Sequence, residues 1–310
     1  MRVAALARVT VVSVSCGEHH SCCLDDEGSL WAWGRAATGA LGLGEEVITQ
    51  SSALASGAEA TDSFNYTISD GQGGTDTAIL PIGATEQHGP HMGCGMDTAI
   101  AHRLCSDVAK QSDVILLPTL PYGCSVGHSQ RWPGTLALNP KTLIDVISDL
   151  GDWVKSSGIR RLVLVNGHVT NEAPLRCALE ILRARHDGFM VALVNTAQIS
   201  ARVKDAHFAD ADDWHANDAE TSLMMHLYPE IVRESKLAEA DDEDRTGNCL
   251  FSHPVNRTSK NGVTGTPSIA SAEKGAELYQ WMCEDFSSLL QQAVKEEAPL
   301  NHRYYESVLK

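Results

Sequence analysis

The sequence predicts an α/β fold in which helices cover both faces of a mostly parallel sheet. From Asp76 onward, segments with strand character alternate with amphipathic segments of helical length. Such alternation is typical of βαβ units, which build parallel sheets. The strand segments, DVILLPTL and RRLVLVN among them, are continuous apolar runs. Runs of this kind indicate strands that are buried on both faces.

The first elements of this region are two strands, a helix between them and a long loop. A strand is expected at Thr77–Gly83 and a helix at Asp97–Ser112, where the apolar residues share one face. A second, buried strand is expected at Asp113–Leu120. The loop that follows, PYGCSVGHSQRWPGT at 121–135, is longer and richer in glycine than a simple connection needs.

Helices and strands continue to alternate in the rest of the chain. Asn139 is expected to cap a helix that has Pro140 at its first position and that Gly158 ends. The later elements are a strand at Arg160–Asn166, a helix at Glu172–His186, a strand at Phe189–Asn195, a polar loop at Asp205–Asp218, a helix near Glu220–Leu227, an irregular stretch to about Ala270 and a long helix from about Ala272 to Glu297. Ser271 is the expected cap of the long helix.

Composition and charge exclude some classes of partner. The chain has 310 residues, 43% of them hydrophobic, and a net charge of −16. This acidity argues against nucleic acid and anionic membrane surfaces, because both bind basic patches. No apolar run is long enough for a transmembrane helix, and Arg8 interrupts the mildly apolar start that a signal peptide would need. The nine cysteines lack metal-finger spacing and fit a reducing compartment, so a cytoplasmic location is expected.

Residues 1–75 differ from the rest of the chain and are rich in Gly, Ser and Ala. Val11–Gly44 resembles one repeat of the RCC1 propeller family through its CG-x-x-HS core, its D-x-x-G turn and the motifs WAWG and GALGLG. Ser63–Ala78 resembles the closing strands of a cadherin-like or bacterial adhesion repeat. One propeller blade cannot bury its faces alone. We therefore expect a short β-prone leader that is not an independent catalytic unit, with a docking module as the alternative.

Polar residues follow two of the expected strands at their carboxyl ends, where sites form in open parallel sheets. Glu86 and His88 are two residues apart, and in an extended chain such residues point the same way. His168 follows another strand through an Asn-Gly turn. Carboxylates and imidazoles that converge are the donors that Zn²⁺ and Mn²⁺ take. A polar turn whose histidines bind backbone is the alternative.

Two further clusters lie at helix starts. Asp97 begins an expected helix, where an ordinary N-cap is the alternative to a metal ligand. The stretch WHANDAETS at 214–222 brings His215 and Glu220 to a loop-to-helix junction, where Glu220 alternatively favours the helix dipole. Four separate clusters at positions that face the same crevice favour metal binding over coincidence.

The segments TAILPIGATEQHGPHMGCGMDT, SVGHSQRWPGT, NGHVTN and HANDAETS together resemble the signatures of the creatininase family of metal-dependent amidohydrolases. The resemblance runs in the family's order and spacing from about Asp76 to Glu297. It implies a three-layer α/β/α domain at 76–298, followed by a tail at 299–310. It also implies a small-molecule substrate, two divalent metal ions per subunit, Zn²⁺ and/or Mn²⁺, and a homo-oligomer, commonly a hexamer in this family.

The resemblance also implies roles for individual residues. The implied metal ligands are Glu86 and His168 for one ion, His88 and Glu220 for the other, and Asp97 as the carboxylate that bridges both. His215 matches a histidine that handles protons and, as a general acid, would protonate the leaving nitrogen. The implied contacts to the substrate are Ser125, His128, Val169, Thr170, Asn171 and Trp214.

Some positions depart from the family pattern. Creatininase has a metal-binding glutamate where Thr170 stands here, so one ion is expected to be held more weakly. Val169 and Thr170 are expected to crowd a wall that is normally open, and Trp214 replaces a glutamate. The tryptophans that surround creatinine have no counterpart in this sequence. Creatinine itself is therefore not the favoured substrate.

These observations predict a hydrolase that opens a non-peptide C–N bond in a small cyclic amide or formamide-like compound. The resemblance implies that a hydroxide bridging the two metals attacks the carbonyl carbon. Hydrolysis of a lactone or another C–O bond at the same centre is one alternative. A non-catalytic interaction protein that docks through the RCC1-like leader is another, although the presence of every implied ligand and of His215 argues against it.

Overall fold

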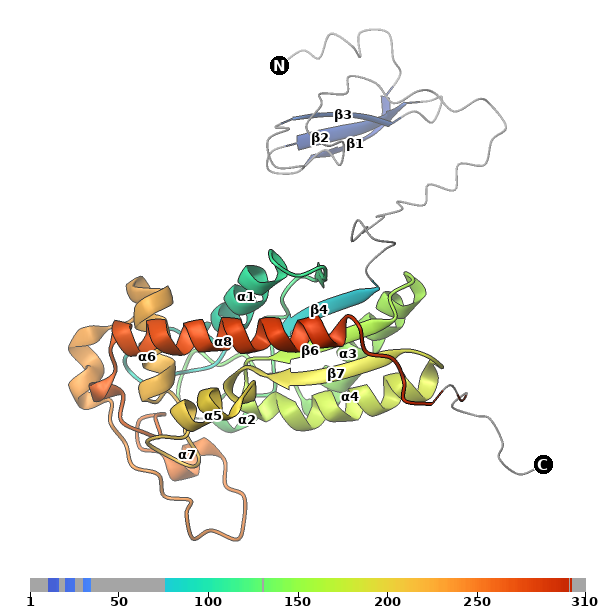
Figure 1. Cartoon of the computed structure of the whole chain (residues 1–310). Helices are drawn as coiled ribbons and strands as arrows, with labels where there is room; N and C mark the ends of the chain where they lie inside the picture. The colour runs from blue at the N-terminus through green and yellow to red at the C-terminus, as the bar shows by residue number, and fades with distance from the viewer. Residues whose placement is uncertain are drawn as a thin grey trace. The chain divides into compact units, whose positions relative to one another are not determined.

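The computed structural model describes residues 76–129, 131–300 and 302, and the backbone of three strands between residues 11 and 34 (Figure 1). The chain divides into two compact units, Met1–Tyr66 and Thr67–Lys310. In the first unit, an antiparallel sheet is formed by β1 (Val11–Cys16), β2 (His20–Asp25) and β3 (Leu30–Gly34). The part of the cadherin-like segment before Asp76 lies outside the described residues.

The second unit contains a four-stranded parallel sheet with the order β5-β4-β6-β7. The strands are β4 (Thr77–Ile82), β5 (Ile115–Leu116), β6 (Arg161–Asn166) and β7 (Met190–Asn195). Ile82 pairs with Asn166, and Asn166 pairs with Asn195, so three strands end at the same edge of the sheet. This arrangement confirms the parallel sheet that the sequence predicts.

Helices cover both faces of this sheet. The α-helices are α1 (Met96–Ala109), α2 (Val126–Ser129), α3 (Pro140–Ser156), α4 (Glu172–Arg185), α5 (Ala201–His207), α6 (Asp218–Leu227), α7 (Val255–Thr258) and α8 (Ala272–Ala293). Short 3-10 helices span Val169–Asn171, Thr196–Gln198, Pro229–Ile231, Glu234–Glu239 and Pro267–Ile269. Among the residues that the structure describes, no helix is long and apolar enough to cross a membrane.

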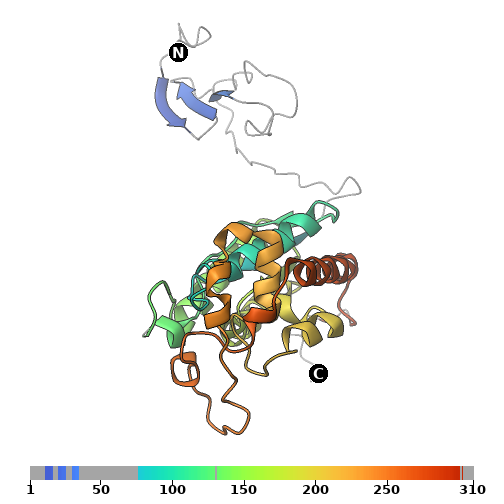
Figure 2. The ribbon, with the colours of Figure 1, turned by 90° about the vertical axis from the view of Figure 1, so that its left-hand side faces the viewer.

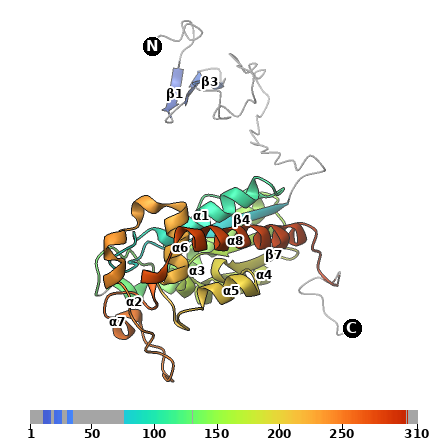
Figure 3. The same ribbon diagram turned by 60° about the vertical axis from the view of Figure 1, so that its left-hand side comes forward.

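Side chains alternate along each strand, so successive residues pack on opposite faces of the sheet. Ile79 and Val163 point to one face and pack with the buried residues of α1, α6 and α8. Leu80 and Leu164 point to the other face and pack with those of α3 and α4. Figure 3 shows α8 running along the sheet with α1 beside it, and α4 on the far side. The fold is therefore a three-layer α/β/α sandwich.

The helix caps that the sequence predicts are present. The side chain of Asn139 accepts a hydrogen bond from the backbone N–H of Lys141 at the start of α3. Ser271 accepts one from the N–H of Lys274 at the start of α8. Such caps satisfy backbone donors that the first turn of a helix leaves free. The length of α8 was overestimated, since it ends at Ala293 and not at Glu297.

The strand predicted at Asp113–Leu120 is much shorter in the structure. Only Ile115–Leu116 forms a ladder with β4. The segment still runs beside β4, since the N–H groups of Leu117 and Leu120 each donate to it at 3.0 Å. The pairing shifts by one residue between them, because Leu117 donates to Ile79 and Leu120 donates to Pro81, which itself has no N–H to donate back. The segment therefore lies beside β4 as the sequence predicts, but it is not one continuous strand.

The polar loop predicted from Asp205 begins inside a helix. α5 ends at His207, and its N-cap Ser200 accepts a hydrogen bond from the N–H of Val203. Val203 and His207 are its buried residues. Seven residues carry too little apolar periodicity for a sequence pattern to reveal a helix.

Candidate metal centre

Five buried residues converge where the strands end. Glu86 and His88 lie in the turn after β4, and His168 follows β6. Asp97 lies in the first turn of α1, and Glu220 lies in the first turn of α6. Figure 1 shows α6 and α7 at the end of the domain toward which β7 points. The cluster thus combines two strand ends with two helix starts.

Asp97 reaches this cluster because α1 begins close to the sheet. A side chain at Gly83 would place its Cβ 2.4 Å from the Cα of Thr98, and one at Gly167 would lie 2.6 Å from the carbonyl oxygen of Asp97. Glycine at both strand ends therefore permits the close approach. The N-cap of α1 is Gly95, and no side chain caps this helix. Asp97 is consequently not an N-cap, which was the alternative role.

The donor atoms form two overlapping groups. The ligand atoms of Glu86, Asp97 and His168 all lie within 4.8 Å of one another, and the same holds for His88, Asp97 and Glu220. Asp97 belongs to both groups. Its Oδ1 lies 3.4 Å from Nε2 of His88, and its Oδ2 lies 3.3 Å from Nδ1 of His168. The structure thus brings together the two sets of three residues that the family resemblance implies.

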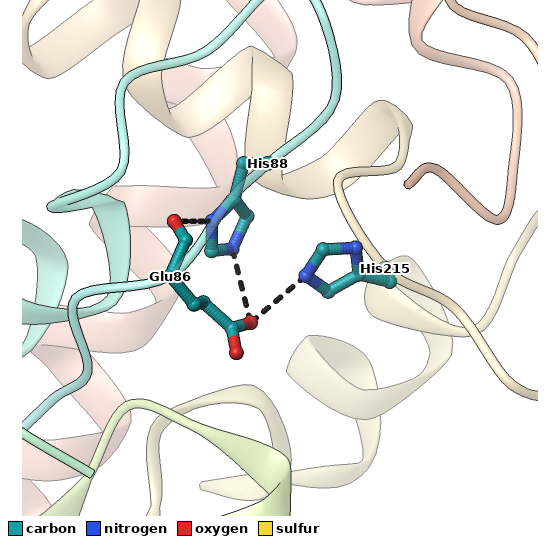
Figure 4. A group of neighbouring side chains, drawn as sticks. All are labelled: Glu86, His88 and His215. Atoms are coloured by element: carbon teal, nitrogen blue, oxygen red, sulfur yellow. Dashed lines mark hydrogen bonds and ion pairs between the residues drawn. The ribbon is translucent and has the colours of Figure 1, made fainter. Parts of the chain in front are cut away.

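The hydrogen bonds behind the histidines fix which nitrogen faces the cluster. Nε2 of His168 lies 3.0 Å from the carbonyl oxygen of Cys124, which only accepts, so Nε2 carries the hydrogen. Nδ1 of His88 donates in the same way to the carbonyl oxygen of Glu86 at 3.1 Å, as Figure 4 shows. The other nitrogen of each ring faces the carboxylates of Glu86 and Asp97, and it presents a lone pair to them when the ring is neutral.

This arrangement fits a cation. Glu86 Oε2, His88 Nε2 and Asp97 Oδ2 are buried and have no hydrogen-bond partner among the described residues. Buried polar atoms without a partner destabilise a fold, and acceptors that face one another repel. A divalent ion between them removes both costs, and a set of imidazole nitrogens and carboxylate oxygens suits zinc and manganese.

The protonation of the carboxyl groups reflects their burial. Burial, with a further contribution from Glu86, raises the pKa of Asp97 to about 8. Burial likewise raises the pKa of Glu220 to about 7. Burial also opposes ionisation of Glu86, but His168 and a hydrogen bond from His215 outweigh it and hold the pKa of Glu86 well below its ordinary value. Shifts of this kind cluster at functional sites.

His215 lies beside the five residues. Its Nδ1 donates to the carbonyl oxygen of Gly262 at 2.7 Å, and its Nε2 lies 2.9 Å from Oε1 of Glu86 (Figure 4). Burial opposes protonation of His215, but the hydrogen bond and the charge of Glu86 outweigh it and raise the pKa of His215 to about 9. The ligand atoms of Glu86, His88 and His215 also lie within 4.8 Å of one another. The position of His215 suits a residue that carries protons. The competing role is that of a metal ligand beside Glu86 and His88.

A cavity of about 410 Å³ opens onto the cluster. Four of the expected substrate contacts line it, namely His128, Val169, Thr170 and Trp214. Val169 keeps 55% of its surface exposed, so it lies at the rim. The remaining walls come from Asp213, Thr264 and the segment 252–255. That segment follows a loop that projects from the domain in Figure 2. Leu250 and Phe251, which directly precede the segment, are exposed.

Ser125 and Asn171 were also expected to contact the substrate, but they do not line this cavity. The hydroxyl oxygen of Ser125 lies 3.2 Å from Nε2 of His168. The side chain of Asn171 accepts from the N–H of Cys124 at 2.7 Å and donates to the carbonyl oxygen of Gly83 at 3.0 Å. Both residues therefore hold His168 and the strand ends in place from behind.

The sequence pattern gave no role in the site to the segment that contains Gly262 and Thr264. This stretch supplies the carbonyl group that orients His215 and part of the cavity wall. It has no regular periodicity, which is why it was predicted only as irregular chain. The dipeptide Asn261-Gly262 was the available signal, because such a pair favours a turn with positive φ, and Gly262 has a φ of +89°.

Two family models match the N-terminal part of the chain. The RCC1 repeat model matches residues 11–38, and a bacterial Ig domain model matches residues 25–83. The second match covers the segment Ser63–Ala78, which resembles a cadherin-like or bacterial adhesion repeat. The two matches overlap at 25–38, so they do not describe consecutive modules.

Curated relatives match most of the rest. The chain is 30% identical to creatinine amidohydrolase of Pseudomonas putida over 71% of its own length and 89% of that protein. It is also 30% identical to the mycofactocin precursor peptide peptidase of Mycolicibacterium smegmatis, over 66% of its length and 80% of the relative.

Solved structures agree with this match. A mutant creatininase described as "Zn-Zn type" has a TM-score of 0.63 at 26% identity, covering 71% of this chain and 91% of the other. "Creatininase Mn" has a TM-score of 0.62, also at 26% identity and with the same coverage. The family model for creatinine amidohydrolase matches residues 66–290. This chain belongs to the creatininase family.

Proposed function

We propose that this chain is a metal-dependent amidohydrolase that uses two divalent ions to open a C–N bond in a small cyclic amide or formamide-like compound. The observation that carries the proposal is the set of acceptor atoms that face one another beside a cavity. The lone pairs of His88 and His168 meet carboxylate oxygens in a buried cluster. A divalent cation between these atoms makes that arrangement favourable.

The same residues would hold the metals. Glu86 and His168 would bind one ion, His88 and Glu220 the other, and Asp97 would bridge the two. Zinc and manganese are the first candidates because of the donor set and because similar solved structures are described as zinc and manganese forms. When bound, two such ions supply Lewis acidity toward a carbonyl oxygen and lower the pKa of water.

The protein's own groups then bind the substrate and move protons. His215 is held at Nδ1 by the carbonyl group of Gly262, so its Nε2 is the atom that gains and loses a proton. We assign it the task of protonating the leaving nitrogen. Val169, Thr170 and Trp214 line the cavity and would restrict the shape of the substrate.

A peptide amide is the second candidate substrate. The curated relatives include mycofactocin precursor peptide peptidases, two of them 30% identical to this chain. The same carbonyl chemistry opens both kinds of amide bond. A lactone remains the third candidate, since an ester carbonyl makes the same demands on the centre.

The experiment that tests the proposal measures metal and activity together. The purified protein is stripped with a chelator, reloaded with zinc or manganese, and measured for metal per chain by elemental mass spectrometry. Each form is assayed on a panel of cyclic amides, formamides, lactones and short peptides. We expect about two ions per chain and hydrolysis of a panel member that disappears on stripping and returns on reloading.

Failure to take up metal after reloading would overturn the proposal. Metal uptake with hydrolysis of peptides or lactones alone would keep the centre but replace the substrate class. We also propose a homo-oligomer in the cytoplasm, and light scattering on the same preparation measures the oligomer size.

A further inference from the structure

Gln87 lies between two residues of the metal centre, but its side chain makes other contacts. It is buried, with 4% of its surface exposed. Its Oε1 accepts a hydrogen bond from the N–H of Gly89 at 2.9 Å. Its Nε2 lies 3.0 Å from Nδ1 of His128 and 3.2 Å from the carbonyl oxygen of Gly262. One amide group thus joins two separate walls of the cavity.

The orientation of this amide is forced by its neighbours. A backbone N–H can only donate, so the atom beside Gly89 is the amide oxygen. A backbone carbonyl can only accept, so the atom beside Gly262 is the NH₂ group. The NH₂ group has two hydrogens, and it has two neighbours to receive them. The second hydrogen therefore points at Nδ1 of His128.

This contact determines the state of His128. A nitrogen that accepts a hydrogen bond carries no hydrogen, so Nδ1 of His128 is unprotonated and the ring is neutral. The hydrogen of the ring then lies on Nε2. Because His128 lines the cavity, Nε2–H is the group that this residue can offer to a bound molecule.

The same amide also acts on His215. The carbonyl oxygen of Gly262 accepts from Gln87 and also from Nδ1 of His215 at 2.7 Å. A Cβ at Gly262 would lie 2.0 Å from Oε1 of Gln87, so only glycine allows this contact. The rings of His128 and His215 have their centroids 4.5 Å apart. Gln87 therefore contacts His128 directly and His215 through the carbonyl group of Gly262.

We propose that Gln87 is a positioning residue that sets the tautomer of His128, with its hydrogen on Nε2, and that holds the carbonyl group of Gly262 against Nδ1–H of His215. His128 would then donate a hydrogen bond to the oxygen on which negative charge develops. His215 would exchange protons only at Nε2. The roles in catalysis rest on the proposed function, whereas the tautomers do not.

The first test is spectroscopic and uses the zinc-loaded full chain, which is diamagnetic. Protein labelled with ¹⁵N-histidine is recorded by long-range ¹H–¹⁵N correlation, which distinguishes the protonated from the unprotonated ring nitrogen. His128→Asn and His215→Asn assign the signals. We expect hydrogen on Nε2 alone for His128, and a hydrogen on Nδ1 of His215 whether or not its Nε2 is protonated. A wild-type His128 with its hydrogen on Nδ1 would overturn the proposal without any reference to activity.

The second test replaces Gln87, the residue that donates the hydrogen bond to Nδ1 of His128. Gln87→Glu presents an oxygen where the NH₂ group stands, so His128 is expected to take a hydrogen on Nδ1. Gln87→Met keeps the volume but donates nothing, so the preference of His128 for one tautomer is expected to disappear. In both variants the metal content is expected to stay at the wild-type value.

On the best substrate of the panel, kcat of both variants is expected to fall about 10- to 100-fold, with KM changed less than about twofold. The matched control is Gln292→Met on the exposed side of α8, which should change neither tautomers nor kcat. Unchanged tautomers in both Gln87 variants would refute the positioning role. If no panel substrate is hydrolysed, the tautomer measurements still decide this proposal, while the proposed function fails on its own.

Discussion

Asp97 connects the two halves of the candidate centre, because each of its oxygens faces a different histidine. In Asp97→Asn the side chain keeps its size but loses its charge and one acceptor. We expect the metal content to fall from about two ions to at most one per chain, with activity lowered by at least about 100-fold. Asp149→Asn, an exposed carboxylate on α3, is the control. Full metal and full rate in Asp97→Asn would contradict the two-ion centre.

Replacement of His215 tests whether this residue carries protons or binds a metal ion. We expect His215→Ala to keep the wild-type metal content and to lose about 10²- to 10⁴-fold in kcat, since the leaving nitrogen no longer receives a proton. Elemental mass spectrometry and steady-state kinetics on the same sample measure the two quantities. Loss of metal from this variant would show that His215 is a ligand and that another group handles the proton.

The burial of His207 predicts that the free energy of unfolding depends on pH. Burial lowers the pKa of this histidine from 6.5 to about 4. As the pH falls below about 6.5, the unfolded chain takes up a proton that the folded chain refuses, so the free energy of unfolding falls until about pH 4.

We expect wild-type protein to lose about 2 kcal/mol more stability than His207→Gln between pH 7.5 and pH 5. Urea unfolding at both pH values measures the difference, and groups that titrate in both proteins cancel. Parallel pH profiles would contradict the assignment.

At the scale of single residues, the sequence predicts those positions whose geometry is local. Glu86 and His88 point to one site because they are two apart after a strand, and His168 follows because a parallel strand ends at the same edge. The contact of Gln87 with Gly262 joins residues 175 positions apart. No local pattern encodes that contact, since it depends on how an irregular segment returns to the sheet.

At the scale of elements, the crossing of α8 over α6 positions Glu220. A Cβ at Gly275 would lie 1.8 Å from the carbonyl oxygen of Ser222 in α6. We expect Gly275→Ala to lower the free energy of unfolding by about 1–3 kcal/mol. We also expect it to weaken metal binding, because α6 must move and it carries Glu220. Thermal unfolding and metal titration measure the two effects.

Gly151→Ala in α3 is the matched comparison. Its Cβ would lie 2.4 Å from Cδ1 of Leu182 in α4, on the opposite face of the sheet. We expect a similar loss of stability but no change in metal affinity. Equal metal affinity in the two variants would contradict the role given to the α6–α8 contact.

Strands and helices were predictable where their residues alone decide the backbone. The caps at Asn139 and Ser271 are local hydrogen bonds, and the apolar runs of β4 and β6 are long. β5 is shorter than the sequence predicts because the expected length follows hydrophobicity, whereas the pairing with β4 shifts between Leu117 and Leu120. α5 was missed because seven residues that bury two side chains give a weak pattern.

At the scale of the whole molecule, all five candidate ligands lie in the second compact unit. We expect a chain without residues 1–75 to keep its metal content and its kcat/KM within about twofold, measured beside a second truncation that removes residues 1–66. Asp76 must stay, because its carbonyl oxygen accepts from the N–H of Arg161 at 2.8 Å and its carboxylate pairs with that side chain. Loss of activity in both truncated forms would assign the first unit a part in catalysis.

The ligand positions also bear on how long the protein survives. The candidate ligands come from three segments that are far apart in the chain, around Glu86 and Asp97, His168 and Glu220, so bound metal would tie together parts that otherwise separate on unfolding. An ion that binds only the folded state adds about 2.7 kcal/mol at a hundredfold excess over its dissociation constant. Proteases act on the unfolded fraction. A cell that is short of the metal would therefore contain fewer copies of this protein, and not merely less active ones.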